Sequence, residues 1–372
     1  MWRRCLIDKR VVVNKYGIIQ GNLFDGCLDC PSSSSISFSD NEKDGMRNEL
    51  VHIAMASNRR YLPGLRATII SLIRAASEPQ CLVFHVFSDG LTMEDKESLV
   101  CLVRQFGYEG RFDFREPDIG EILSRFKAYN DSLMPVLRLY FPEIFSELDW
   151  ILWTDVDVLW FRDPISFWAE RDDSVSLVWS RDIPSTRKAA VKHAKFPIVG
   201  DKDGDWKDYA CSGVMLMNLR RLRNTGFLTK CVDFVNKWGS PFFPDQDILN
   251  FICGKDAKLV DGRWDLLYPV PSVEDGVVIH FNGIGPKFND SSYTGMSPLY
   301  EIWFRFVHQI VDGQGNRQIC PLWKRAFFTA ISILYPVRRV ISFFTDPIHP
   351  WCSDFIQRTL LFSWLRRKVL WK

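Results

Sequence analysis

The sequence has few cysteines, no long apolar run and almost no net charge. Ten cysteines at irregular spacing in 372 residues are too dilute for a small disulfide-stabilised fold. No stretch approaches the roughly 18 uncharged apolar residues that a membrane-spanning helix requires. A formal net charge of +2 produces no average field that would attract a polyanion, so we expect no nucleic acid partner.

The N-terminal residues also lack the features of a secretory leader. Residues 1–17 are basic, but they contain neither a clean apolar segment nor a small-residue cleavage site. The proline and serine run that begins at Pro31 is typical of a flexible linker. Cys27 and Cys30 have the spacing of half a zinc site, but no second pair follows at a suitable distance. We therefore expect an N-terminal extension over residues 1–50, ordinary thiols and a reducing, cytoplasmic location.

The C-terminal residues 317–372 differ from the rest in charge and aromatic content. They contain ten Lys or Arg and two Asp, which give a net charge of +8 and leave −6 for the residues before them. Four Trp and six Phe lie among these charges, and Pro336, Pro347 and Pro350 divide the segment into short helices. Short basic and aromatic helices suit the headgroup layer of an anionic membrane, which predicts a peripheral protein on the inner face of the membrane. The alternative is a small helical subdomain that packs on the main domain.

Residues 51–281 alternate between strand-length apolar runs and amphipathic segments. We expect strands at residues 51–56, 81–88, 111–115, 150–154, 175–179, 211–218 and 276–281, and helices at residues 61–77, 92–106, 133–141, 142–148, 219–238 and 246–253. Strands that alternate with helices predict an α/β fold with a mostly parallel sheet covered on both faces. Ligands of such sheets bind beyond the carboxyl ends of the strands, so the residues that follow each strand are the first candidates for a site.

Two carboxylates directly follow the fourth expected strand. In the run WILWTDVDVLWF, residues 150–161, Asp155 and Asp157 lie between apolar flanks that a solvated loop would not have. In extended backbone, side chains two residues apart face the same way, so these carboxylates can converge on one cation. The following positions lack the oxygen ligands and the glycine of a calcium loop. Two carboxylates leave coordination positions open, which suits a Mg²⁺ or Mn²⁺ ion that bridges to a diphosphate.

A histidine at the end of the last expected strand is the candidate third ligand. His280 is followed by the run FNGIGPK, residues 281–287. A neutral imidazole with two carboxylates favours Mn²⁺ over Mg²⁺, which prefers oxygen ligands alone. Gly283 lets the backbone approach a phosphate closely, and Lys287 can neutralise it. The alternative for His280 is a hydrogen-bonded histidine of the core.

Four segments together resemble glycosyltransferase family 8, whose members are retaining enzymes with the GT-A fold. In the family's order, the segments are VHIAMASNRRYLPGLRATIISL from residue 51, LDWILWTDVDVLWFRDP near residue 149, CSGVMLMNL with PDQDILNFI between residues 211 and 252, and VIHFNGIGPKF near residue 278. The resemblance implies a GT-A nucleotide-diphospho-sugar transferase domain, with a Rossmann-like, mixed and mostly parallel sheet, over residues 51–316. The C-terminal segment is similar to the membrane-attaching end of lipopolysaccharide galactosyl- and glucosyltransferases of that family, which implies a short helical tail.

The resemblance also implies the metal and donor contacts. Asp155 and Asp157 would bind Mn²⁺ together with His280, and the metal would hold the diphosphate of a UDP-sugar. The residues that would contact this donor are Ala56, Asn58, Arg60, Tyr61, Arg138, Asp155, Val156, Asp157, Gly283 and Lys287. The family usually has Asp at the position of Asn58 and Asn at the position of Arg60.

Three residues match the family's catalytic positions. Asp245 and Gln246 correspond to the pair beside the transferred sugar, and Arg138 corresponds to an arginine that contacts the donor phosphate and sugar. Retention of configuration requires a nucleophile below the sugar or attack from the side of the leaving group. Asp245 can act as a nucleophile, whereas the neutral Gln246 cannot. The resemblance favours attack from the leaving-group side, with the departing phosphate oxygen taking the acceptor proton.

Three further residues, Asp182, Cys211 and Ser212, would lie on the acceptor side. The family usually has Asn at the position of Cys211, so the resemblance does not define the sugar. We expect transfer of galactose or glucose to a saccharide, such as a lipopolysaccharide or another envelope glycan.

Two other functions remain open from the sequence. A sugar nucleotidyltransferase would also use carboxylates and a divalent ion, but it normally has a Gly-rich basic loop after the first strand. The corresponding run MASNRRYLPG, residues 55–64, has two Arg and one late Gly. A non-catalytic, membrane-associated sugar-binding protein would not need the complete set of Asp155, Asp157 and His280.

Overall fold

The computed structural model of the chain describes residues 49–116, 126, 134–198, 206–267, 277–281 and 306. Most of the expected N-terminal extension, the expected tail over residues 317–372, Gly283 and Lys287 lie outside the described residues. The described helices and strands all belong to one of two units of the chain, residues 22–283. No described helix is both long enough and apolar enough to cross a bilayer.

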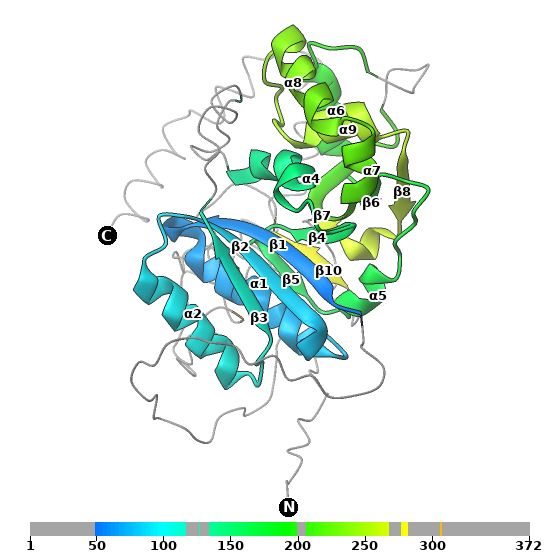
Figure 1. The fold of residues 1–372 in the computed structure, drawn as a ribbon. Helices are drawn as coiled ribbons and strands as arrows, with labels where there is room; N and C mark the ends of the chain where they lie inside the picture. Colours follow the sequence, from blue (N-terminus) through cyan, green and yellow to red (C-terminus); the bar gives the residue numbers. More distant parts are fainter. Residues whose placement is uncertain are drawn as a thin grey trace, which may run out of the picture. The chain divides into compact units, whose positions relative to one another are not determined.

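A seven-stranded mixed sheet forms the centre of this unit (Figure 1). Its strands are β1 (Val51–Asn58), β2 (Leu82–Asp89), β3 (Arg111–Arg115), β4 (Trp150–Thr154), β6 (Leu177–Arg181), β7 (Ala210–Asn218) and β8 (Ala257–Val260). They lie in the order β3-β2-β1-β4-β7-β6-β8. Within the described residues, four of the six neighbouring pairs are parallel, and β7 runs antiparallel to both β4 and β6. The prediction of an α/β fold with a mostly parallel sheet is confirmed.

A smaller sheet of three strands adjoins the carboxyl end of β4. It consists of β5 (Val158–Trp160), β9 (Leu266–Leu267) and β10 (Val278–His280), in the order β5-β10-β9. β10 is antiparallel to β5 and parallel to β9. Because β5 begins only four residues after β4 ends, this pairing brings the end of β10 close to the loop that follows β4.

Helices cover both faces of the large sheet. The α-helices are α1 (Leu62–Ala75), α2 (Met93–Gln105), α4 (Phe141–Ile144), α5 (Pro164–Trp168), α6 (Pro184–His193), α7 (Leu219–Asn224), α8 (Phe227–Trp238) and α9 (Gln246–Cys253), and the 3₁₀ helices are η1 (Arg59–Tyr61), η2 (Pro79–Cys81), η3 (Met134–Tyr140) and η4 (Gly262–Trp264). Ala54 and Ala56 of β1 pack in a buried cluster with η3, α4, α7, α8 and α9. Ile53 and Met55 are also fully buried, and by strand alternation they face the opposite side, where α1 contacts β1.

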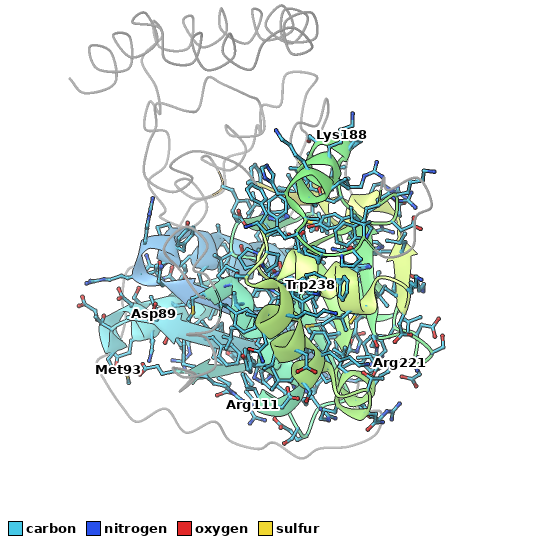
Figure 2. The ribbon with its side chains drawn as sticks, turned by 90° about the horizontal axis from the view of Figure 1, so that it is seen from above. Asp89, Met93, Arg111, Lys188, Arg221 and Trp238 are labelled. Atoms are coloured by element: carbon cyan, nitrogen blue, oxygen red, sulfur yellow. The ribbon has the colours of Figure 1, made fainter. Side chains whose placement is uncertain are left out.

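The two halves of the sheet carry different helices. Figure 1 shows α1 and α2 beside β1, β2 and β3, whereas α6, α8 and α9 gather near β6, β7 and β8. The view from above separates the same halves, with Asp89, Met93 and Arg111 labelled on the first and Lys188 and Trp238 on the second (Figure 2). The boundary between the halves is the pair β1 and β4, whose carboxyl ends lie together because Ala54 and Trp153 are register partners. This edge is where an open α/β sheet binds ligands.

Local sequence signals explain where several elements begin. α2 starts with a capping box, in which the side chains of Thr92 and Asp95 each accept a hydrogen bond from the other residue's backbone amide. α1 has Pro63 in its first turn, where a missing amide hydrogen costs nothing. Nearly all of β1 is buried, as expected for a central parallel strand covered on both faces.

Two expectations for the helices need correction. The helix expected over residues 219–238 is two helices, because Gly226 adopts a left-handed conformation with φ of 65° and ends the first one. The helix expected over residues 133–141 is mostly a 3₁₀ helix, η3, and the helix expected over residues 142–148 is replaced by the four-residue α4. The short elements β5, α5, α6, β8 and β9 were not expected at all, because none has a long periodic pattern.

Candidate functional site

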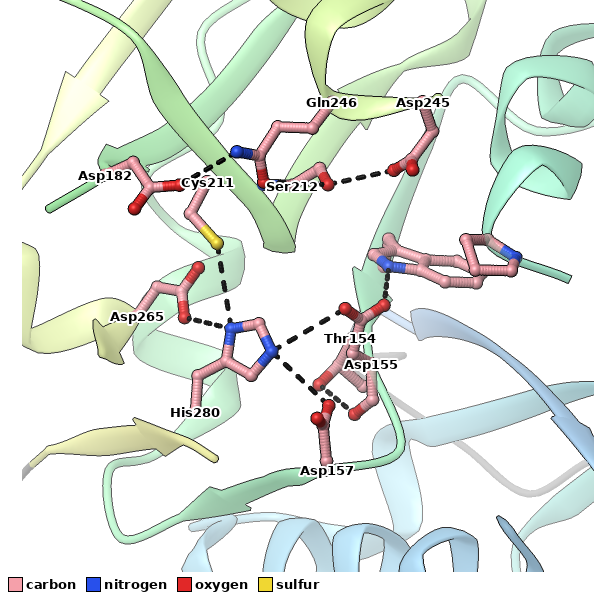
Figure 3. Close-up of polar contacts among 12 residues, drawn as sticks. Thr154, Asp155, Asp157, Asp182, Cys211, Ser212, Asp245, Gln246, Asp265 and His280 are labelled. Atoms are coloured by element: carbon pink, nitrogen blue, oxygen red, sulfur yellow. Dashed lines mark hydrogen bonds and ion pairs between the residues drawn. The ribbon is translucent and has the colours of Figure 1, made fainter. Parts of the chain in front are cut away.

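Asp155, Asp157 and His280 lie together just beyond the carboxyl end of β4 (Figure 3). Nε2 of His280 is 3.3 Å from Oδ1 of Asp157 and 3.7 Å from Oδ2 of Asp155. One potential ligand atom from each residue lies within 4.8 Å of the other two. The side chain of Asp155 is 27% exposed, whereas that of His280 is 4% exposed, so the solvent side of the cluster is at Asp155.

A turn, and not extended backbone, brings the two carboxylates together. Asp155 and Asp157 were expected on one face of an extended chain, but Val156 and Asp157 form a turn between β4 and β5. The amide of Asp155 donates to the carbonyl of Gly213 at 2.8 Å, and the amide of Phe281 donates to the carbonyl of Asp157 at 2.9 Å. Both sides of the turn are therefore attached to neighbouring strands, and the convergence depends on these long-range bonds.

The second ring nitrogen of His280 also faces a carboxylate. Nδ1 is 3.0 Å from Oδ1 of Asp265 and 3.7 Å from Sγ of Cys211. Burial alone would lower the pKa of His280, but the charges of Asp265 and Asp157 outweigh it and raise the pKa well above its usual value. Burial, followed by the charges of Asp265 and Asp182, raises the pKa of the Cys211 thiol. Cys211 is therefore a neutral thiol beside the imidazole.

Asp265 is the residue of this cluster that sequence reasoning missed. It lies between η4 and β9 and is almost fully buried. Leu267, two residues after Asp265, is the register partner of His280, and this pairing places Asp265 beside the imidazole. The run GRWDLLY, residues 262–268, has neither a strand-length apolar stretch nor a helical period, so it predicted no element. The feature of the sequence that could have indicated a buried acid here is the position of Asp265 between Trp264 and two leucines.

Gly213 leaves the space that the imidazole occupies. A Cβ atom built at Gly213 would lie 2.2 Å from Cε1 and 2.4 Å from Nδ1 of His280. Such contacts require the ring or the strand to move, and the ring is held at Nδ1 by Asp265. The glycine of the CSG run in β7 therefore has a steric role at the metal-ligand candidate.

Arg138 is buried and binds two carboxylates of the site. Its Nη2 donates to Oδ1 of Asp155 at 2.8 Å, and Nη1 is 3.4 Å from Oδ2 of Asp245. Nη1 also donates to the carbonyl of Ser212, and the guanidinium carbon lies 4.1 Å from the ring centroid of Trp153. Burial, Asp157 and Asp245 raise the pKa of Asp155, while Arg138 and His280 oppose this shift. The structure thus places the charge of Arg138 against Asp155 and Asp245.

A chain of hydrogen bonds links the remaining catalytic and acceptor-side candidates. The amide nitrogen of Gln246 donates to Oδ2 of Asp182 at 2.8 Å, and its amide oxygen accepts from the backbone of Ser212 at 3.0 Å (Figure 3). The Ser212 hydroxyl donates to Oδ2 of Asp245 at 2.9 Å. Burial raises the pKa of Asp182 to about 6. Together with the contact between Asp245 and Arg138, these bonds form one connected network.

The residues expected to contact a nucleotide lie at the carboxyl end of β1. Ala56 and Asn58 belong to the strand, and Arg60 and Tyr61 belong to η1, which follows it directly. Oδ1 of Asn58 accepts the amide of Tyr61 at 3.3 Å and so caps η1. Arg60 is exposed. These residues adjoin the turn after β4 because β1 and β4 are parallel neighbours.

Within the described ranges, two groups of three residues could hold a metal ion, and both contain His280. One consists of Asp155, Asp157 and His280, and the other of Cys211, Asp265 and His280. The second group is entirely buried, whereas the first includes the partly exposed Asp155. The first group is therefore the one that an ion shared with a bound ligand could reach.

The chain matches the family described as "Glycosyl transferase family 8" over residues 52–288. The match covers well over half of the 372 residues and contains every candidate site residue described above. The chain belongs to glycosyltransferase family 8.

Curated members resemble this family 8 chain over part of their length. Glucoside xylosyltransferase 2 of Mus musculus is 29% identical over 199 residues, which cover 45% of this chain and 40% of the relative. Glucoside xylosyltransferase 1 of Gallus gallus is 24% identical over 232 residues, which cover 55% of this chain and 49% of the relative. The chain thus spans about half the length of these curated relatives.

Solved structures share the fold. The galactosyltransferase LgtC, in complex with donor and acceptor sugar analogs, has a TM-score of 0.56 and 21% identity, and the match covers 74% of this chain and 99% of LgtC. WbbM, a bifunctional glycosyltransferase, also has a TM-score of 0.56, with 14% identity over 74% of this chain and 53% of WbbM. The expected GT-A fold of this family 8 chain is therefore confirmed.

Proposed function

We propose that the chain transfers a hexose, galactose or glucose, from a UDP-sugar to a saccharide acceptor with retention of configuration, and that the reaction depends on a divalent metal. The observation that carries this proposal is the convergence of Asp155, Asp157 and His280 at the ligand-binding edge of the sheet in a family 8 chain. LgtC, which matches in fold, was solved with donor and acceptor sugar analogs.

The chemistry of the cluster fits a divalent cation. Two carboxylates and one imidazole are a donor set for Mn²⁺, with Mg²⁺ as the alternative. The raised pKa of His280 indicates that the surrounding carboxylates favour positive charge at this position. When bound, the metal would neutralise the donor diphosphate and stabilise the charge that develops as UDP leaves. Asp155, Asp157 and His280 would hold it.

The donor would extend from the end of β1 across the turn after β4. The residues proposed to contact it are Ala56, Asn58, Arg60, Tyr61, Arg138, Asp155, Val156, Asp157, Gly283 and Lys287. The described members of this set belong to β1, η1, η3 and the turn, which adjoin one another at the carboxyl edge of the sheet. This proximity supports a single nucleotide-sugar site.

The transferred sugar would lie beside Asp245 and Gln246. Ser212 and Arg138 both contact the carboxylate of Asp245, which keeps it oriented and compensates its charge. Arg138 would act mainly by holding Asp155 and Asp245, since its guanidinium is buried against them. Because Asp245 is already paired, we favour attack from the leaving-group side, with the departing phosphate oxygen accepting the proton of the acceptor hydroxyl.

A panel of donors tests the proposal. The full chain is incubated with Mn²⁺ and UDP-galactose, UDP-glucose, UDP-xylose or UDP-galacturonic acid, and released UDP is measured, with Asp157→Asn as the control. We expect UDP release with a UDP-hexose and loss of release in the control. Pyrophosphate exchange with UTP would instead indicate a nucleotidyltransferase, and donor binding without release would indicate a sugar-binding protein.

We further propose that the acceptor is a lipopolysaccharide or another envelope glycan and that the chain acts in the cytoplasm, peripherally on the inner face of the membrane. Asp182, Cys211 and Ser212 would face this acceptor. The +8 charge and the aromatic content of residues 317–372 support the membrane contact. Replacing the three basic residues 366–368 by Gln should weaken binding to phosphatidylglycerol vesicles and leave UDP release unchanged. Equal vesicle binding by this variant would contradict the membrane proposal.

A further inference from the structure

We propose that Asp265 is a positioning residue that orients His280 as a metal ligand. The inference rests on the proposed metal site. Metal-binding histidines usually donate their second ring N–H to an oxygen acceptor, which defines the tautomer and raises the basicity of the ligating nitrogen. The side chain of Asp265 is fully buried, and its Oδ1 lies 3.0 Å from Nδ1 of His280.

The chemistry of the pair determines which nitrogen faces the metal. An ionised carboxylate can only accept hydrogen bonds, so its partner Nδ1 must carry a hydrogen. The opposite nitrogen, Nε2, is the one that faces Asp155 and Asp157. Cys211 also lies near Nδ1, but a thiol is a weak acceptor. Asp265 is therefore the group that can direct the lone pair of Nε2 towards a metal ion held by the two carboxylates.

A backbone hydrogen bond and the packing of its neighbour hold Asp265 in this position. Its amide donates to the carbonyl of Gly262 at 3.2 Å, and the preceding Trp264 is buried and contacts both Phe167 and Arg162. The ring centroids of Trp264 and Phe167 are 4.8 Å apart, and the guanidinium carbon of Arg162 is 3.6 Å from the centroid of Trp264. Asp265 also directly precedes β9, which pairs with the strand that ends at His280.

Packing alone does not account for an acid at this position. A buried carboxylate is costly unless its oxygens are paired. Oδ2 of Asp265 is buried and has no hydrogen-bond partner among the described residues. The contact that the structure offers to this carboxylate is the imidazole of His280, together with the nearby thiol of Cys211. A role in orienting His280 explains why an acid occupies this position.

Binding of Mn²⁺ tests the inference without an activity assay. The full chain is titrated with Mn²⁺ in the presence of UDP, and free Mn²⁺ is followed by electron paramagnetic resonance, with UDP alone as the blank. Asp265→Ala should weaken Mn²⁺ binding by about 10- to 100-fold. Asp265→Asn should fall between Asp265→Ala and the wild type, because the amide oxygen can still accept from Nδ1. In a His280→Ala background, Asp265→Ala should cause no further loss.

The matched control is Asp247→Asn, since Asp247 is equally buried but binds Tyr209 and not His280. It should leave Mn²⁺ affinity unchanged. If Asp265→Ala does not fold, as judged by circular dichroism, Asp265→Leu replaces it with a side chain of similar size and no acceptor. Wild-type affinity in a folded variant, or an equal loss in the His280→Ala background, would overturn the positioning role. Failure of the wild type itself to bind Mn²⁺ would instead refute the proposed function.

Discussion

Two buried histidines, His280 and His85, have opposite pKa shifts although both are nearly excluded from solvent. Carboxylates face both ring nitrogens of His280, and their charges raise its pKa well above the usual value despite burial. One nitrogen of His85 faces His52 at 2.9 Å, and the other faces Asp113 at 3.1 Å. Burial dominates there and lowers the pKa of His85 to about 4. Burial by itself therefore does not decide the charge of a histidine.

The two pKa shifts differ because the two imidazoles have different amounts of uncompensated negative charge around them. Asp113 beside His85 is already paired with Arg115 at 2.6 Å, so little charge is left to hold a proton on the ring. Among the described residues around His280, by contrast, four acids accompany one buried arginine. The acids are Asp155, Asp157, Asp245 and Asp265, and Arg138 pairs with the first and third. A cluster with uncompensated acids favours a cation, and this property separates the candidate metal site from an ordinary histidine of the core.

The largest expected effect is on stability and comes from replacing Arg138, near His280, as compared with Arg115, near His85. Arg138→Ala should destabilise the chain by about 3–5 kcal/mol, because it leaves the buried carboxylate of Asp245 and the partly exposed carboxylate of Asp155 without their partner. Arg115→Ala should cost below about 1 kcal/mol, because its side chain is 30% exposed and water can replace it. Urea unfolding of both variants measures the difference. Equal losses of unfolding free energy would show that the ion pairs of the buried Arg138 contribute no more to stability than those of the partly exposed Arg115.

The second effect is a pH dependence of stability that comes from His85. Its pKa is about 4 in the folded chain and about 6.5 when unfolded, so between these values the unfolded chain binds a proton that the folded chain does not. The contribution of His85 to stability should therefore fall by about 3 kcal/mol as the pH drops from about 6.5 to 4. Buried carboxyl groups such as Asp182, whose pKa is raised to about 6, act in the opposite direction, so urea unfolding is measured at pH 7 and pH 4.5 for both the wild type and His85→Gln. The change from pH 7 to pH 4.5 should be less favourable in the wild type than in the variant by most of this amount, and an equal change in both would contradict the prediction.

The third prediction compares one acid from each cluster. Asp157→Asn should weaken Mn²⁺-dependent UDP binding by about a hundredfold or more, which corresponds to about 2.7 kcal/mol, because it removes a proposed metal ligand. Asp113→Asn, in the cluster around His85, should leave this affinity unchanged. Isothermal titration calorimetry with UDP at constant Mn²⁺ gives both values. Equal affinities in the two variants would refute the metal assignment.

The smallest effect is steric and concerns Gly213. Gly213→Ala would place a methyl group against the ring of His280 and should cost about 1–3 kcal/mol of stability, together with weaker Mn²⁺ binding. Gly262→Ala is the matched control, since a Cβ atom there meets nothing within 4 Å, and it should stay within about 0.5 kcal/mol of the wild type. Thermal unfolding and the Mn²⁺ titration compare the two. Normal Mn²⁺ binding by Gly213→Ala would show that the imidazole of His280 can move without a loss of metal affinity.

Much of the large sheet could be predicted because its strands are continuous apolar runs. The run from Val51 predicted β1 within two residues of its observed end, and β3 and β4 have the predicted bounds. The two-residue strand β9 and the three-residue strand β5 were missed, since so short a run has no period to read. Because β9 was not predicted, the position of Asp265 beside His280 was not predicted either, since it depends on the pairing of β9 with β10.

The order of residues alone determined the α/β class, the family and the choice of Asp155, Asp157 and His280 as the candidate metal ligands. Only the tertiary structure decided how they meet: the bonds from Asp155 to Gly213 and from Phe281 to Asp157 hold the turn, and Asp265 reaches the imidazole from a strand that local sequence does not indicate. The physical reason is that periodicity and composition act over a few neighbouring residues. Hydrogen bonds and charges act between side chains that only the folded chain brings within a few ångströms of one another.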